Sequence, residues 1–157
     1  MGISGFSTGI LVNNSNNVDL EDIKILDSEK HGIEVISSEG LDILGSVVDG
    51  SEDDNIILDP DSSGAEITNT ISSSSENIGI VLHSDGNTLD NVTVSGNDDD
   101  GLFINNYDLT HDCTDCTEKT EVFNSKFESN SGKGLTIESA ENIHIYQNII
   151  DSSMDVE

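Results

Sequence analysis

The sequence predicts an all-β solenoid of about six coils, in which short parallel strands stack into continuous sheets. Three observations indicate this class. A Gly-apolar-x-apolar motif recurs about every two dozen residues, apolar residues within each copy are spaced by two, and clusters of Gly, Asn, Ser and Asp separate the copies. Because one coil cannot bury its own apolar side, stacked coils must share a core. These features describe a right-handed parallel β-helix.

The motif occurs six times, and its spacing defines the coils. The copies are GILV at Gly9, GIEV at Gly32, NIIL at Asn55, GIVL at Gly79, GLFI at Gly101 and GLTI at Gly134. Successive copies begin 23, 23, 24, 22 and 33 residues apart. Equivalent residues are therefore expected to stack about 4.8 Å apart, the usual spacing of neighbouring strands. We expect a single β-helix domain over residues 1–157, either whole or as an excerpt of a longer protein.

The first strand of each coil carries the predicted core. Its residues one and three positions after the motif's first residue are all Ile, Val or Leu, which pack well in strands. They are Ile10 and Val12, Ile33 and Val35, Ile56 and Leu58, Ile80 and Leu82, Leu102 and Ile104, and Leu135 and Ile137. A spacing of two, rather than 3.6, argues against helices.

A second short apolar run follows in every coil after a polar bend. Two residues beyond its apolar position stand Asp22, Gly45, Asn69, Asn91, Asn124 and Gln147. Amide side chains stacked in such a column bond to one another and to the backbone of a bend, so an asparagine ladder is expected here. Asn91 also begins an Asn-Val-Thr glycosylation sequence, and a ladder would bury it.

The fifth interval is about ten residues longer than the others, which places an inserted loop at 106–121. Insertions in solenoids form loops on one face, often the functional face. The segment holds the only two cysteines, Cys113 and Cys116, beside His111. We favour a disulfide that pins the loop, as in an exported protein. The same residues supply three of the four ligands of a structural zinc site, so a metal or free thiols remain alternatives.

The composition excludes two classes of partner. The chain has 32 Asp and Glu against five lysines and no arginine, which gives a net charge of −27. Nucleic acid and anionic membranes both need a cationic surface. High salt, bound divalent cations or disorder would each accommodate this charge, although a disordered chain does not require so regular a repeat. No run of about 18 apolar residues predicts a membrane span, and no signal peptide is recognisable at the N-terminus.

The outward residues of the first strand form the candidate binding surface. Ile57, Val81 and Phe103 make an apolar ridge that suits a sugar ring, a neighbouring subunit or the inserted loop. Polar residues stand beside this ridge at the strand ends. We expect Phe103, Asn105 and Glu138 to contact substrate, with the Asn105 amide bonding a carboxyl group.

Three further residues form the candidate catalytic group. Asp59 and His83 share the column at the strand ends, and Tyr107 begins the insertion one coil later. A neutral imidazole or an ionised phenol can take the proton next to a uronate carboxyl group while the other returns one, and Asp59 would orient the imidazole or hold a cation. The alternative is that polar side chains stack here without a catalytic role.

Acidic turns before the third and fifth coils predict a cation site on one edge. The turns are SEDDN at 51–55 and NDDDG at 97–101, with Glu76 in the turn between them. The candidate ligands are Asp53, Asp54, Glu76, Asp98, Asp99 and Asp100. An oxygen-rich strip suits Ca²⁺, the one cofactor expected, while solvated acidic turns are the alternative. His31, in a turn, and His144 are assigned structural roles.

Two stretches resemble the repeats of mannuronan C5-epimerases and related alginate lyases. They are GIVLHSDGNTLDNVTVSGNDDDGLFI and KHGIEVISSEGLDIL, whose repeat pattern is also similar to NosD-like and pectate-lyase-like proteins. The resemblance implies a sugar-binding face and places Asp59 and Pro60 in a strand that ends Asp-Pro-His in the family. Here Asp61 replaces that histidine. The chain also lacks an arginine to neutralise a uronate carboxylate, and its lysines fall outside the columns of Asp59 and His83.

Two functions follow from these features. The first is a carbohydrate-associated module of a polyuronate C5-epimerase-like or lyase-like protein, acting on acidic polysaccharide outside the cell or at its surface. The alternative is a non-catalytic extracellular solenoid: an adhesin, surface or glycan-binding segment. In either case the chain is expected to self-associate or to pack against further β-helix coils.

Overall fold

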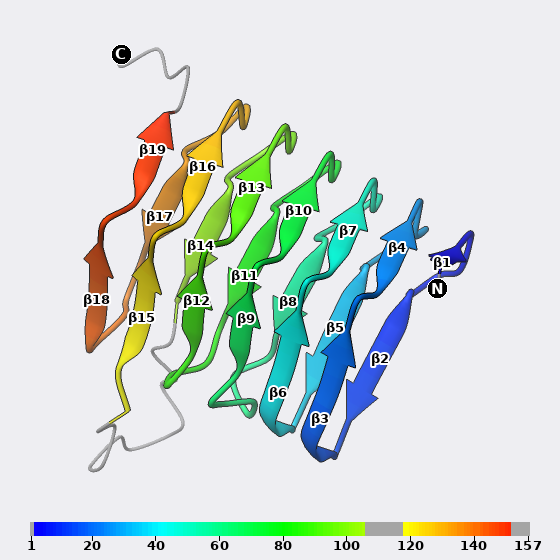
Figure 1. Cartoon of the computed structure of the whole chain (residues 1–157), viewed down its shortest axis with the longest axis horizontal. Helices are drawn as coiled ribbons and strands as arrows, with labels where there is room; N and C mark the ends of the chain where they lie inside the picture. The colour runs from blue at the N-terminus through cyan, green and yellow to red at the C-terminus, as the bar shows by residue number, and fades with distance from the viewer. Residues whose placement is uncertain (1, 106–117, 152–157) are drawn as a thin grey trace.

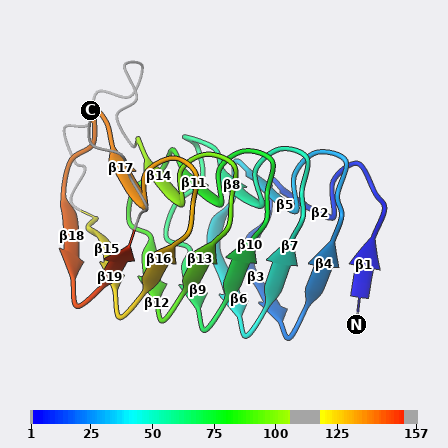
Figure 2. The same cartoon turned by 90° about the horizontal axis from the view of Figure 1, so that it is seen from above.

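The structure is a computed structural model that describes residues 2–105 and 118–151. Within these ranges the chain forms 19 strands and no helix. The strands make three parallel sheets, here named A, B and C, which run along the length of the solenoid (Figures 1 and 2). Each coil passes through sheets B, C and A in that order. Consequently, none of these residues belongs to an apolar helix that could cross a membrane.

Each sheet takes one strand from every coil. Sheet B consists of β2 (Ile10–Asn13), β5 (Ile33–Ile36), β8 (Ile56–Leu58), β11 (Ile80–Leu82), β14 (Leu102–Ile104) and β17 (Leu135–Ile137). Sheet C consists of β3 (Asn16–Glu21), β6 (Glu39–Leu44), β9 (Glu66–Thr68), β12 (Thr88–Asp90), β15 (Thr120–Phe123) and β18 (Ile143–Tyr146). Sheet A consists of β1 (Gly2–Ser4), β4 (Lys24–Leu26), β7 (Val47–Asp49), β10 (Ile71–Ser73), β13 (Thr93–Ser95), β16 (Lys126–Glu128) and β19 (Ile149–Asp151).

The register of sheet B agrees with the repeat read from the sequence. Val35 pairs with Leu58, Leu58 with Leu82, and Leu82 with Ile104. All four side chains are buried and belong to one hydrophobic core. Residues about two dozen apart therefore lie over one another, and the all-β parallel solenoid predicted from the sequence is confirmed.

The core is less complete in the end coils of this chain. Ile10 and Leu135 are only partly buried, and Ile137 is 44% exposed although the sequence places it inward. The first and last coils each have one stacked neighbour in the described residues, so one side of their apolar side chains stays uncovered. Ile150 of β19, which pairs with the buried Phe127, is exposed for the same reason. Ile149 instead continues the outward column of Lys126, Thr93 and Ile71.

The predicted asparagine column exists, but its predicted burial is wrong. Asn69 and Asn91 stack and share a 2.7 Å hydrogen bond, yet both are exposed. Their φ angles of 52° and 54° lie in the left-handed region, which asparagine adopts more readily than most residues. The column therefore marks a surface bend that requires positive φ, and the Asn91 side chain is accessible to solvent.

The buried asparagine ladder lies elsewhere, inside the turn that leads from sheet A to sheet B. Asn55 Nδ2 lies 3.4 Å from Asn97 Oδ1, and Asn97 Nδ2 donates to Asn130 Oδ1 at 2.8 Å. All three side chains are buried. They supply the hydrogen bonds that backbone groups in a buried bend would otherwise lack, including an acceptor for the Ser75 N–H at 3.0 Å.

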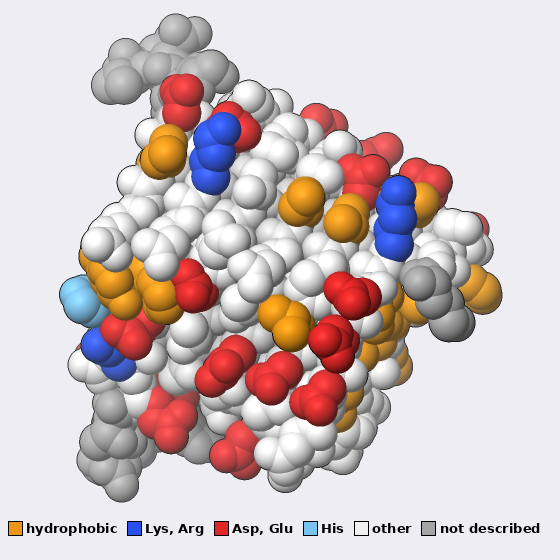
Figure 3. Space-filling model, viewed as in Figure 1, with side chains coloured by type: hydrophobic (Ala, Val, Ile, Leu, Met, Phe, Trp, Pro, Cys, Tyr) orange, Lys and Arg blue, Asp and Glu red, His pale blue; other side chains and the backbone are white. Residues whose placement is uncertain are grey.

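On the face formed by sheets A and C, acidic side chains gather over sheet C (Figure 3). On sheet C, Asp19 pairs with Asp42 and Asp42 with Glu66, and all three side chains are exposed. Like charges directly opposite each other on neighbouring strands destabilise a sheet. Screening by salt would therefore weaken the repulsion along this column.

Strand β15 begins at Thr120, inside the range predicted for the inserted loop. Thr120 and Glu121 thus belong to sheet C. Residues 106–117, the remainder of the insertion apart from 118 and 119, lie outside the described ranges.

Candidate functional site

The outward face of sheet B carries the predicted apolar ridge in register. Ile57 pairs with Val81, and Val81 with Phe103, across β8, β11 and β14. Val81 is only 3% exposed, whereas Ile57 and Phe103 are partly exposed. The surface available to a ligand on this ridge is therefore offered by Ile57 and Phe103.

The polar column at the end of sheet B is also in register. His83 N–H donates to Leu58 O at 3.0 Å, Asn105 N–H to Leu82 O at 2.9 Å, and Glu138 N–H to Ile104 O at 2.9 Å. Because each of these residues directly follows its strand, the backbone ladder places Asp59, His83, Asn105 and Glu138 in successive coils. His83 and Asn105 are partly exposed and Glu138 is exposed.

Asp59 has a structural role that the sequence did not indicate. Its carboxylate accepts the Ser37 N–H at 3.1 Å and the Ser62 hydroxyl at 2.6 Å. These bonds close the bend after β8 and connect it to the preceding coil. In the ranges that the structure describes, Ser37 and Ser62 hold this carboxylate and no hydrogen bond or ion pair joins it to His83, so a role for Asp59 in orienting the imidazole stays a prediction.

His83 instead contacts Phe103 of the next coil. The two rings meet edge to face, with centroids 6.1 Å apart and an interplanar angle of 74°. This contact brings together two of the predicted site residues, beside Asn105. Tyr107 and the proposed disulfide of Cys113 and Cys116 lie outside the described residues, so those assignments stay predictions.

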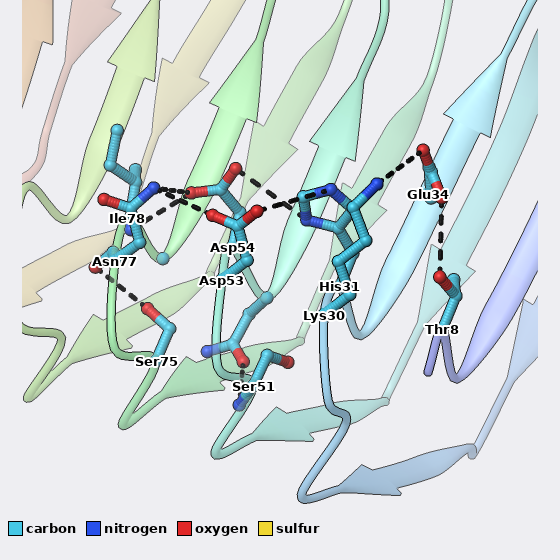
Figure 4. A network of polar contacts seen from close by, with 12 residues as sticks. Thr8, Lys30, His31, Glu34, Ser51, Asp53, Asp54, Ser75, Asn77 and Ile78 are labelled. Carbon is cyan, nitrogen blue, oxygen red and sulfur yellow. Dashed lines mark hydrogen bonds and ion pairs between the residues drawn. The ribbon is translucent and has the colours of Figure 1, made fainter. Parts of the chain in front are cut away.

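A second cluster lies at the opposite end of the sheet B strands, in the turns that precede them (Figure 4). Asp53 and Asp54 of the third coil lie beside His31 of the second coil. The distances are 3.7 Å from His31 Nε2 to Asp53 Oδ2 and 3.9 Å from His31 Nδ1 to Asp54 Oδ2. In residues 2–105 and 118–151, these three form the one group of potential metal ligands whose donor atoms all lie within 4.8 Å of one another.

Burial raises the pKa of the Asp54 carboxyl above its ordinary value. The backbone N–H of Ile78, which donates to Asp54 Oδ1 at 3.1 Å, opposes this shift, and the neighbouring Asp53 charge adds to it. Loss of solvation is the largest of these effects. The Asp54 carboxylate therefore loses solvation on burial, and its hydrogen bonds from Ile78 and Asn77 offset this loss only in part.

The other four predicted metal ligands do not join this cluster. Glu76, Asp98 and Asp99 are exposed, and Asp100 bonds to the Lys133 N–H at 2.6 Å and to the Thr136 hydroxyl. Asp100 thus makes the same backbone contact to the next coil as Asp54 does. A calcium site along the whole strip stays a prediction, which a Ca²⁺ titration would test.

His31 is the residue of this cluster that sequence reasoning missed. The repeat spacing itself carried the signal, because His31 and Asp54 each directly precede the first residue of the motif, at Gly32 and Asn55. Residues in the same position of successive coils stack, and a histidine stacked on an acidic residue is a candidate ligand pair. In the sequence analysis, His31 is placed in a turn without being compared with Asp54, the equivalent residue of the next coil.

The chain belongs to the right-handed β-helix family. The sequence model of this family, described as the right-handed β-helix region, matches residues 8–156, nearly the full length of the sequence. No curated protein matches the sequence.

Among solved structures, the chain is similar to the periplasmic alginate epimerase AlgG. A double mutant of that enzyme superposes with a TM-score of 0.78 at 18% identity, over 98% of this chain and 38% of the epimerase chain. A single mutant gives 0.70 at 16% identity, over 93% and 38%. A further AlgG structure gives 0.72 at 15% identity, over 98% and 43%. At these identities the likeness shows the fold, and the chain spans about two fifths of the epimerase.

Proposed function

We propose that this chain is the polysaccharide-binding part of an alginate-epimerase-like β-helix protein, and that the outward face of sheet B binds the glycan. The observation that carries the proposal is the grouping of His83, Phe103 and Asn105 on this face. The fold shared with AlgG over almost the whole chain supports the same assignment. The periplasmic location of those enzymes supports an exported protein.

The three side chains offer complementary contacts to a sugar. The Phe103 ring presents apolar surface to the C–H groups of a pyranose, while the Asn105 amide donates and accepts hydrogen bonds. The imidazole of His83 has no hydrogen-bond partner among the described residues and is partly exposed. It is therefore available to a hydroxyl or carboxyl group of a ligand.

Electrostatics restrict how an acidic glycan binds. Lys30 lies next to sheet B but is paired with Glu34 at 3.7 Å, and Lys119 and Lys126 each pair with a glutamate of sheets C and A. A uronate carboxylate beside His83 and Asn105 would thus meet an imidazole and an amide, while Lys133, which is exposed, precedes β17 at the other end of the sheet B strands. We expect binding of acidic polysaccharide to strengthen as salt screens the repulsion from the −27 chain.

Catalysis is the second candidate function, as a C5-epimerase or lyase. The partly exposed imidazole of His83 favours it, because a neutral histidine can take a proton from a uronate C5. Tyr107 would return a proton in this scheme. Since Asp59 is bonded to Ser37 and Ser62, His83 would act without a carboxylate partner, and this favours binding over turnover.

Binding is tested with oligomannuronate, oligoguluronate and an uncharged mannan oligosaccharide, by calorimetry in high salt. Phe103→Ala is expected to weaken binding about tenfold, the effect of losing roughly 1.4 kcal/mol of ring contact. Phe123→Ala is the matched control, since Phe123 stacks on Tyr146 of sheet C at 4.9 Å. Equal effects of the two variants, or no binding by any of the three glycans, would reject the proposal.

Turnover is tested separately by following C5 inversion by NMR and unsaturated products by ultraviolet absorption. The catalytic function predicts turnover that His83→Ala abolishes. Binding without turnover, with and without added Ca²⁺, would instead leave the chain as a glycan-binding solenoid. Self-association through the exposed apolar end coils is a further prediction, checked by sedimentation of the same samples.

A further inference from the structure

The turn from sheet A to sheet B brings one imidazole and two carboxylates from neighbouring coils together. The Asp53 N–H donates to Lys30 O at 3.0 Å, and the Gly32 N–H donates to Asp54 O at 3.2 Å. These two backbone bonds fix the third coil against the second. They place the side chains of Asp53 and Asp54 beside the imidazole of His31, as Figure 4 shows.

His31 is a buried residue whose Nδ1 atom has no hydrogen-bond partner among the residues that the structure describes. The residue is 5% exposed, and its Nδ1 atom is fully buried with no partner within hydrogen-bonding distance. Buried polar atoms are normally paired, because an unpaired one loses its bonds to water without replacement. Both ring nitrogens face a carboxylate oxygen, at 3.7 Å for Asp53 and 3.9 Å for Asp54. These distances are too long for hydrogen bonds.

The two carboxylates are oriented from the opposite side. Asn77 Nδ2 donates to Asp53 Oδ1 at 3.1 Å and to Asp54 Oδ1 at 2.9 Å, and the Ile78 N–H also donates to Asp54 Oδ1. Thus the fourth coil engages both Oδ1 atoms. Both Oδ2 atoms are left facing the imidazole, in the arrangement of metal ligands held by an outer hydrogen bond.

We propose that His31, Asp53 and Asp54 bind one divalent first-row transition-metal ion, for which Zn²⁺ is the probe. One imidazole nitrogen and two carboxylate oxygens are ligands that Zn²⁺ accepts, with water completing a four-coordinate site. Ca²⁺ fits less well because it takes six to eight oxygen ligands, and the cluster presents two free carboxylate oxygens and a nitrogen. The Asp53 side chain is 41% exposed, so the site is open to solvent on that side.

Bound metal would crosslink two neighbouring coils. It would join the second coil to the third, give the buried imidazole a partner, and offset two of the negative charges of the chain. This role is independent of glycan binding on sheet B, so the two proposals succeed or fail separately.

The binding test must exclude the second zinc-binding candidate, the segment that contains His111, Cys113 and Cys116. We therefore use the full-length chain with Cys113→Ser and Cys116→Ser, and compare it with the unmodified chain. Zn²⁺ affinity is measured by competition with a chromophoric chelator. Co²⁺ absorption spectra report whether thiolate or only nitrogen and oxygen ligands are bound.

We expect one Zn²⁺ per cysteine-free chain and a Co²⁺ spectrum without thiolate charge-transfer bands. His31→Gln should reduce the affinity by at least about 100-fold, and Asn77→Ala, which alters only the outer hydrogen bonds, by about 10- to 100-fold. Asp53→Asn, at a partly exposed side chain, gives a second ligand variant with little risk to folding. His144→Gln is the control, because His144 lies 3.3 Å from Glu121 on the surface of another sheet.

Three results would overturn the proposal. They are no bound Zn²⁺ in the cysteine-free chain, an affinity that His31→Gln and Asp53→Asn leave unchanged, and an equal loss in His144→Gln. A circular dichroism spectrum of each variant confirms that the strands are intact.

Discussion

Replacing Asn97 by alanine tests the interior of the solenoid at one residue. Asn97 Oδ1 accepts the Ser75 N–H at 3.0 Å and the Ser75 hydroxyl at 2.9 Å, and Asn97 is fully buried. The hydroxyl keeps a second acceptor, Asn77 O at 3.1 Å, whereas the Ser75 N–H loses the one acceptor that the structure shows for it. A buried donor without a partner costs about 1–3 kcal/mol, and the space left by the amide adds to this cost.

The expected loss in the free energy of unfolding is therefore about 2–4 kcal/mol. The assay is urea denaturation followed by circular dichroism in high salt, with the midpoint and the slope compared between variants. Asn91→Gly is the matched control. Its side chain is exposed, and its φ of 54° suits glycine, so a change below about 1 kcal/mol is expected. Should Asn97→Ala be no more destabilising than Asn91→Gly, the buried ladder would not contribute as the structure indicates.

Three further predictions concern backbone packing, charge and pH. Gly32→Ala should destabilise the chain more than Gly96→Ala. A Cβ at Gly32 would clash with Val48 Cγ1 and lie 2.6 Å from Asn55 O, whereas a Cβ at Gly96 meets nothing within 4 Å. The cost at Gly96 is therefore the roughly 1–2 kcal/mol of placing alanine in a left-handed backbone conformation. Thermal melts of the two variants decide this. Added NaCl should raise the melting temperature, since each stacked pair in the column Asp19, Asp42 and Glu66 repels by about 0.8 kcal/mol in water before screening. Asp42→Asn should reduce the slope of melting temperature against salt concentration. An unchanged slope would show that repulsion along this column does not limit stability. Hydrogen bonds from Lys119 and His144 lower the pKa of Glu121, so its contribution to stability is present above its ordinary pKa of 4.5 and is lost as pH falls through the lower folded value. The stability difference between the wild type and Glu121→Gln should therefore be small but present at pH 7 and absent in strong acid, as measured by urea midpoints across pH.

The fold could be predicted from the sequence because one physical requirement repeats in every coil. Stacked strands need apolar residues at alternate positions, and the pairs such as Ile80 and Leu82 recur at nearly constant spacing. The surface bend was recognisable for a similar reason, since positive φ selects Asn, Asp and Gly at Asn69 and its equivalents. Its exposure was not predictable, because both surface and interior bends favour asparagine.

The candidate site was less predictable, because a column gives the position of a side chain but not its partners. Asp59 and His83 do share a column, yet the groups that donate hydrogen bonds to Asp59 are Ser37 and Ser62, which lie outside that column. The approach of His83 to Phe103 likewise depends on side-chain rotamers. The position of His31 could have been predicted, because its stacking on Asp54 follows from the repeat spacing alone.

The proposed function requires sheet B to be the glycan-binding face. Mapping the backbone amide shifts of the isotope-labelled chain during titration with oligomannuronate or oligoguluronate tests this directly. We expect the largest changes at Val81, His83, Phe103 and Asn105, with little change along β10 and β13 of sheet A. Shifts concentrated on sheet A or C, or none at saturating oligosaccharide in high salt, would contradict it.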